Sequence, residues 1–156
     1  MALTDKLSDV SQLLVDLIIA NAQTLGIPDV PGATTVGSDP SVFYGDQVMI
    51  PVTPTVCVDP VQRQRDLSET GYQTTVDLAV FVIIYHGKVQ DMQTNLKECI
   101  QFAEAVEAVL YTDKQLQGNV VHSYVSNMDM GQMIRGRTLM RATRLTWRGL
   151  SKAQIW

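Results

Sequence analysis

The segment that most constrains the fold is LAVFVIIY, Leu78–Tyr85, in which every side chain is apolar. A helix that crosses a membrane needs about 20 such residues, so this short run predicts a buried strand. Just before it, Thr75–Leu78 alternates polar and apolar side chains. Because neighbouring residues of a strand face opposite sides, the first part of the strand should expose one face, whereas Val80–Tyr85 should be covered on both faces.

The N-terminal quarter of the chain predicts a helix followed by a loop. Apolar side chains recur at helical spacing over Leu3–Leu25, where Thr4 or Asp5 is expected to cap the start and Gly26 to end the helix. Residues 27–47 hold three of the six prolines and show no period, which predicts an extended loop or arm. A loop of this length in a compact domain is usually functional or loosely held.

The next part of the chain predicts a β-hairpin. Residues 53–68 and 72–85 form two extended runs that are separated by a short polar turn. Pro60 has no backbone N–H to donate to a neighbouring strand, so the first run should lie at a sheet edge or carry a bulge at that position.

The second half of the chain predicts another helix and two more strands. The helix is expected to begin at Gln90 or Asp91 and to bury one stripe, formed by Leu96, Ile100, Ala103, Val106 and Leu110. Strands are predicted at Asn119–Asn127 and Arg137–Trp147, joined by a loop that carries methionines. The expected fold is therefore α+β: one mainly antiparallel sheet of about four strands with two helices packed on it, in the order α-β-β-α-β-β.

Length and composition favour one domain. The chain has 156 residues, of which 46% are apolar, so residues 1–156 should share one core from which the arm at about 27–47 departs. No basic region precedes the first apolar stretch, and Asp16 interrupts that stretch, so we expect no secretory signal. Cys57 and Cys99 lie far apart among apolar neighbours, and we expect them to be reduced core thiols of a protein made in a cytoplasm.

Charge is divided unevenly along the chain. Residues 1–129 hold sixteen acidic and six basic side chains, which gives −10, whereas residues 130–156 hold six basic and no acidic ones, which gives +6. The two parts sum to the net charge of −4. A molecule with this polarity suits head-to-tail contact with copies of itself or with charged partners.

Four of the six basic residues in 130–156 lie in or directly after the last predicted strand: Arg137, Arg141, Arg144 and Arg148. The alternation of apolar and basic side chains slips by one near Thr143, and a β-bulge at Ala142–Arg144 would restore a single basic face. Three interpretations stay open: a solvated face, a protein contact surface and a nucleic-acid site. Arginine suits fixed contacts with carboxylates and phosphates, but Trp147 is the only aromatic residue of the strand, which disfavours base stacking.

No residue pattern indicates an active site. His86 and His122 stand outside any metal-binding spacing. Cys99 with either histidine is the nearest approach to a nucleophile pair, but its place beside the apolar stripe favours an inert thiol. Glu104 and Glu107, three residues apart on a helix, are expected to form a solvated or subunit-facing edge. We therefore expect no catalytic residue, no cofactor and no metal.

Four segments in order suggest a family: VFYGDQVMIPVTPTVCVDP, VDLAVFVIIYHG, CIQFAEAVEAVLYTD with LQGNVVHSYVSNMDMG, and LMRATRLTWRG. Together they resemble the tail-terminator and head-tail connector proteins of tailed bacteriophages, from about residue 40 to the C-terminus. The resemblance implies a structural virion protein rather than an enzyme. Such proteins are similar in fold to tail-tube subunits and form a ring, commonly a hexamer, on the last ring of the tube.

The resemblance also implies a place in the virion and a set of partners. The ring stops tube growth, sits at the neck, and joins the tail to the head. Its partners are copies of itself, the tail-tube protein, and a head connector or stopper protein, with no membrane, while packaged DNA passes through the hole without sequence-specific contact. Expected interface residues are Arg137, Arg141, Arg144, Arg148, Met130, Met133 and Trp156. The alternatives are a head-side connector or stopper and, from another class, a non-specific nucleic-acid-binding module.

Overall fold

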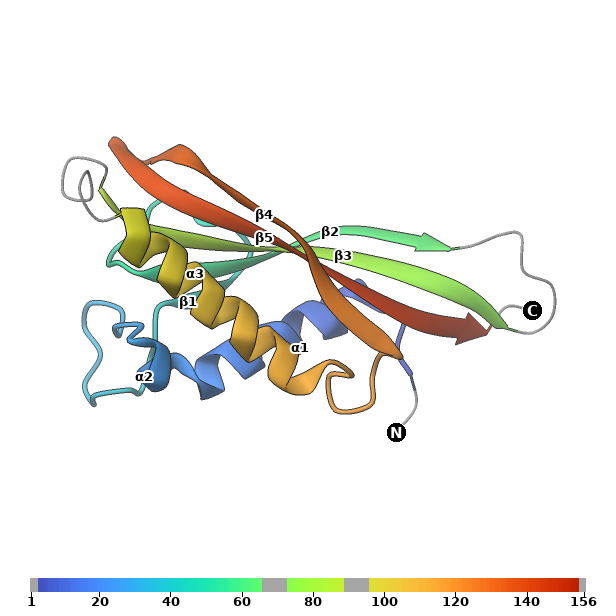
Figure 1. Ribbon diagram of the computed structural model, residues 1–156. Helices are drawn as coiled ribbons and strands as arrows, with labels where there is room; N and C mark the ends of the chain where they lie inside the picture. Colours follow the sequence, from blue (N-terminus) through green and yellow to red (C-terminus); the bar gives the residue numbers. More distant parts are fainter. Residues whose placement is uncertain (1–2, 66–72, 89–95, 155–156) are drawn as a thin grey trace.

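The computed structural model describes residues 3–65, 73–88 and 96–154, and it shows one five-stranded sheet with helices packed on one of its faces (Figure 1). The strand order is β1-β2-β3-β5-β4, and only β1 runs parallel to its neighbour. The elements are α1 (Leu7–Ala20), α2 (Ala22–Leu25), β1 (Val42–Tyr44), β2 (Thr55–Arg65), β3 (Gln73–Lys88), α3 (Leu96–Leu110), the short 3-10 helix η2 (Tyr111–Asp113), β4 (His122–Arg135) and β5 (Thr138–Gln154). The predicted α+β class is confirmed, and the sheet is mixed with five strands rather than antiparallel with about four.

The N-terminal helix is interrupted at Asn21, whereas the sequence predicts one continuous helix. The amide of Asn21 donates to the carbonyl of Leu17 at 2.9 Å, and the residue has φ −109° and ψ 8°, outside the helical range. Gly26 then ends α2 with φ +79°, a left-handed conformation that glycine adopts without steric cost, as predicted. The predicted cap is wrong: Lys6 occupies the N-cap position without a side-chain bond to the helix.

Helix α3 buries a stripe that differs from the predicted one in its first turn. Cys99 is the first buried residue, followed by the predicted Ala103, Val106 and Leu110. Of the predicted stripe, Leu96 is 45% exposed and Ile100 is half-buried. The predicted helix start at Gln90 or Asp91 lies outside the described residues.

The 27–47 arm contains a strand that the sequence does not reveal. β1 pairs in parallel with Val56–Val58 of β2 and so becomes an edge of the sheet. Ahead of it, the carboxylate of Asp29 accepts the backbone N–H groups of Gly37 and Asp39 at 2.7 and 3.2 Å. These bonds tie the arm into a compact turn.

The first predicted hairpin is confirmed by the antiparallel pairing of β2 with β3. The register shifts between Pro60 and Gln62, and this part of β2 lies beyond the three residues that β1 covers, so Pro60 lies at an edge and beside a bulge, as predicted. The predicted turn between the two strands lies outside the described residues.

The second hairpin corrects the expected methionine loop. Residues 128–134 belong to β4, which pairs with β5 along its whole length. The strands are joined by a two-residue turn, Gly136–Arg137, in which Gly136 has φ +64°. Glycine at the first central position is typical of the tightest hairpin turns. Strand β4 therefore forms the second edge of the sheet.

The core lies between the helices and the sheet. Val10, Leu14 and Ile18 of α1 are fully buried together with alternate residues of β3 and with Trp147 of β5. Gly149 gives the Trp147 ring its room, because a Cβ there would lie 2.4 Å from the nearest ring carbon. This packing seals one face of the sheet, so any site that needs the sheet surface must use the other face.

Candidate interface on the open face of the sheet

The sheet face that points away from the helices, here called the open face, carries its own apolar cluster. Because side chains alternate along β3, Phe81, Ile83 and Tyr85 point to this side, opposite Val80, Val82 and Ile84 of the core. Residues packed with them are Cys57, Met140 and Ala142, with Phe43, Ile50 and Met133 at the margin. Burial raises the pKa of the Cys57 thiol to about 12, which marks a dry environment.

The chain itself covers one end of the open face. The Tyr85 hydroxyl donates to the Asp46 carboxylate at 2.6 Å, and Asp46 also pairs with Arg135. The Arg135 guanidinium lies 5.3 Å from the centre of the Tyr85 ring. Burial, followed by the hydrogen bond to Asp46, raises the pKa of Tyr85, so its hydroxyl stays protonated. The predicted covering of both faces thus arises here within one subunit, from the loop that carries Asp46 and from β4.

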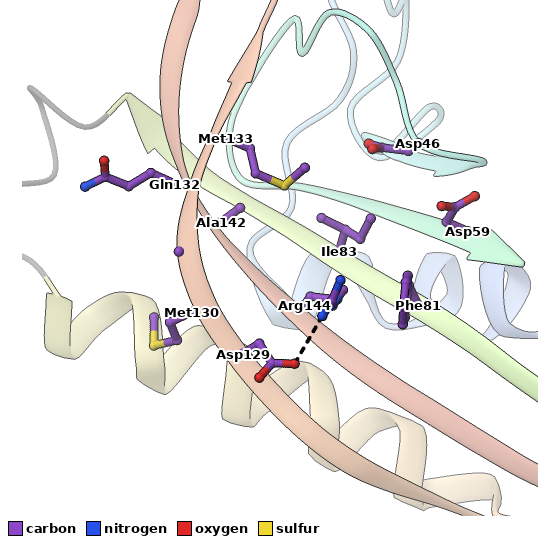
Figure 2. Close-up of a pocket in the computed structure, with 11 residues that line it drawn as sticks. Asp46, Asp59, Phe81, Ile83, Asp129, Met130, Gln132, Met133, Ala142 and Arg144 are labelled. Carbon is purple, nitrogen blue, oxygen red and sulfur yellow. Dashed lines mark hydrogen bonds and ion pairs between the residues drawn. The ribbon is translucent and has the colours of Figure 1, made fainter. Parts of the chain in front are cut away.

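Next to this covered end the open face has a pocket of about 340 Å³ (Figure 2). Its floor is apolar, and charged groups stand around it; the lining residues are Asp46, Asp59, Phe81, Ile83, Asp129, Met130, Gly131, Gln132, Met133, Ala142 and Arg144. They come from β2, β3, β4, β5 and the loop before β2. A half-open apolar floor with polar walls is the usual make-up of a binding site.

An ion pair forms one wall of the pocket. The Arg144 guanidinium lies 3.5 Å from the Asp129 carboxylate and 4.4 Å from the centre of the Phe81 ring. Figure 2 shows both charged side chains at the pocket's edge. Both groups are about half exposed, so the pair contributes about 1 kcal/mol or less to stability, and the Phe81 contact adds an amount of similar size.

Asp59 stands on the opposite wall without a partner. Within the described parts of the chain its carboxylate has neither a hydrogen bond nor an ion pair. Burial and the nearby charge of Asp46 raise its pKa above the ordinary value. The pocket therefore has a negative group whose charge is not compensated.

The four predicted arginines do not form one basic face: Arg137 lies in the turn before β5, and the other three lie in β5. Register shifts lie in the partner strands, between Tyr85 and Gly87 and between Val125 and Asn127, while β5 continues unbroken through Ala142–Arg144. The predicted bulge is therefore wrong, and the alternation of β5 splits the arginines. Arg144 and Arg148 lie on the open face, opposite Ile83 and Ala79.

Arg141 lies on the other side, under α3. Its positive charge acts on His86 and Cys99, and its Nε is buried without a partner among the described residues. It is half-buried and so contributes little surface for contact. The sequence of β5 alone does not show that the irregularity lies in β3, opposite Arg141 and Ala142, rather than in β5 itself.

The remaining predicted interface residues fall into three environments. Met130 and Met133 line the pocket, and Met133 places its sulfur 4.0 Å from the Tyr85 hydroxyl. Arg137 is exposed in the β4–β5 turn, away from the pocket of its own chain. Trp156 lies outside the described residues. The structure thus places Met133 on the open face with Arg144, whereas Met130, aligned with Thr143, and Arg141 point to the other face.

The nearest candidate for a nucleophile pair is held neutral by burial. His86 is 7% exposed, its Nε2 lies 2.7 Å from the hydroxyl of Thr143, and its ring meets Phe102 edge-on. Burial and the charge of Arg141 lower the pKa of His86 to about 4, and burial raises the pKa of Cys99. An activated thiol needs the opposite shift, toward the thiolate.

The site residues that the sequence does not single out are Asp46, Asp59, Phe81, Tyr85 and Arg135. The spacing of Phe81, Ile83 and Tyr85 by two residues is a usable signal, because it places all three on one strand face. Asp46 and Arg135 are far apart in the sequence, so no pattern of neighbouring residues predicts the contact between them.

Comparison with known proteins adds no name to this site: no protein-family model matches the chain, and a search of curated proteins finds no match. Over residues 3–65, 73–88 and 96–154 no three histidine, cysteine or acidic side chains gather as they would around a metal ion. In the same residues no helix has the length and hydropathy needed to cross a bilayer.

Proposed function

We propose that this protein is a structural virion component, a tail terminator that forms a ring at the head-proximal end of a phage tail tube, stops tube polymerisation and joins the tail to the head. The support is the family resemblance together with one structural observation. That observation is the one-sided construction of the sheet, in which helices seal one face and the open face keeps a pocket flanked by charged groups. A sheet built in this way has a surface left for a neighbour.

The edge strand β4 supports the same proposal. Among the residues that the structure describes, no strand pairs with its outer side, and it exposes apolar side chains such as Tyr124, Met130 and Ile134. Long edges of this kind favour association with another chain. A ring uses such surfaces repeatedly, because each subunit contacts the next one through the same pair of patches.

The distribution of charge fits partners on both sides. The acidic body and the basic C-terminal strands of neighbouring copies attract each other in a head-to-tail arrangement. The proposed partners are other copies of the chain, the tail-tube protein below and a head connector above, with DNA passing through the hole. A head-side connector or stopper is the alternative role for the same ring. The nucleic-acid-binding module is less favoured, because the β5 arginines lie on different faces.

Negative-stain electron microscopy of the purified protein at high concentration tests the proposal. Rings with a central hole, alone or after addition of purified tail-tube protein, are the expected result. Pull-down separates the two neck roles, since a terminator retains tube protein and a head-side stopper retains the portal or its adaptor. Small uniform particles under both conditions, with no retention of either partner, would contradict the neck role.

A further inference from the structure

We propose that the pocket beside Asp59 receives the side chain of Arg137 from a second copy of the chain, and that this contact joins neighbouring subunits head to tail. The inference rests on the ring proposed above and names the residues that make one of its contacts.

The acidic side of the contact is Asp59. Three carboxylates line the pocket, but Asp46 is paired with Arg135, and Asp129 is paired with Arg144. Asp59 alone has no cation beside it among the described residues. A half-buried carboxylate that is kept uncompensated in one subunit is stabilised when a cation from outside reaches it.

The floor of the pocket favours arginine over a small cation. Phe81, Ile83 and Ala142 present apolar surface between the charged walls. The methylene stem of an arginine buries itself on such a floor, and its planar head stacks on an aromatic ring while it bonds a carboxylate. Phe81 already has one guanidinium against it, that of Arg144, which shows that the ring accepts this geometry.

Arg137 is the basic residue best placed to leave its own subunit. Four of the other arginines form ion pairs within the subunit: Arg63 and Arg65 with Asp5, Arg135 with Asp46, and Arg144 with Asp129. The remaining two lie within β5, where Arg141 is half-buried under α3 and Arg148 is in the middle of the strand. Arg137 is exposed and has no partner among the described residues. It stands in the β4–β5 turn at the end of a long hairpin (Figure 1).

The turn that carries Arg137 is held in a fixed place. The backbone N–H of Gly136 donates to the carbonyl of Val48 at 2.8 Å, and Met49 packs beside Gly136. A preformed turn loses little conformational entropy when it docks. Because the turn and the pocket are different surfaces of one subunit, each copy can offer its turn to one neighbour and its pocket to the other, as the proposed ring requires.

Charge exchange between the two positions tests the contact. The variants are Asp59→Arg, Arg137→Asp and the double exchange. Asp59→Asn is a milder variant, because it removes the negative charge without adding a positive one. Asp77→Arg is the matched control, because Asp77 is an exposed acid on the same face outside the pocket. Circular dichroism and thermal melting report whether each variant is folded, and sedimentation velocity over a concentration series reports self-association.

Each single reversal is expected to weaken self-association about tenfold or more, because it puts like charges opposite each other. The double exchange should restore association to within about threefold of the wild type, Asp59→Asn should weaken it less than Asp59→Arg, and Asp77→Arg should leave it unchanged. Rescue by the double exchange is the result that a merely structural role of either residue does not produce.

Three outcomes overturn the contact. If the wild type stays monomeric at every concentration, no second copy fills the pocket, and the neck role is then tested separately with tube protein. If both single variants form rings as the wild type does, the ring stands and this contact is wrong. If Asp59→Arg loses tube protein while self-association is unchanged, the occupant of the pocket belongs to the tube rather than to a second copy.

Discussion

Acidification should destabilise this protein through His86. The imidazole is 7% exposed, bonded to Thr143, and held under α3 near the positive Arg141 and the neutral thiol of Cys99. Its pKa is about 4 in the folded protein against 6.5 for a free side chain. Between these two pKa values the unfolded state binds a proton at His86 and the folded state does not. The stability contributed by neutral His86 is therefore fully present above pH 6.5 and is lost as the pH falls toward 4.

The size of the effect follows from the two pKa values. One unit of difference corresponds to about 1.4 kcal/mol, and integration from pH 7.5 to pH 4.5 gives a loss of about 2.5 kcal/mol in the free energy of unfolding from this residue. For a single domain of this size that is a large share of the total stability.

The assay is urea unfolding at several pH values between 7.5 and 4.5, for the wild type and for His86→Gln. Glutamine retains a hydrogen-bonding group for Thr143 but does not titrate. Other groups, including Asp59, titrate in both proteins and cancel in the difference. The wild type should lose about 2.5 kcal/mol more than the variant over this range. Equal pH dependence in the two proteins would refute the assignment of a low pKa to His86.

Two further predictions concern packing and the covered end of the open face. Gly149→Ala forces a methyl group onto the Trp147 ring and should cost about 1–3 kcal/mol in thermal or urea unfolding, whereas Gly131→Ala, with open space at its Cβ, should change stability by less than about 0.5 kcal/mol. Tyr85→Phe removes the hydroxyl that donates to Asp46 and should cost about 1–2 kcal/mol; an unchanged urea midpoint would show that this bond contributes nothing.

Part of the fold follows from local sequence patterns. The apolar run of β3, the helical periodicity of α1 and α3, the stop at Gly26 and the edge position of Pro60 are all properties of neighbouring residues. Side-chain period and backbone preference act within a few residues, so they are readable without any tertiary contact. The α+β class and the first hairpin follow from the same information.

The departures from prediction occur where a distant segment decides. β1 is a strand because β2 provides its hydrogen-bond partners, and the methionine segment is a strand because β5 lies beside it. Propensity is weak in both of these segments, so tertiary pairing determines the outcome. The break at Asn21 is the exception, because it comes from a local bond of its own side chain to the preceding turn.

The candidate site is divided in the same way. The sequence by itself determined the charge polarity of the chain and placed Met130, Met133 and the arginines among the candidate contacts. Only the tertiary structure separated Arg141 from Arg144, because it shows that β5 continues without a bulge between them, so residues three positions apart point to opposite faces. Only it left Asp59 without a cation, because the pairing of Asp46 with Arg135 and of Asp129 with Arg144 depends on how the strands are placed and aligned, about which a local pattern carries no information.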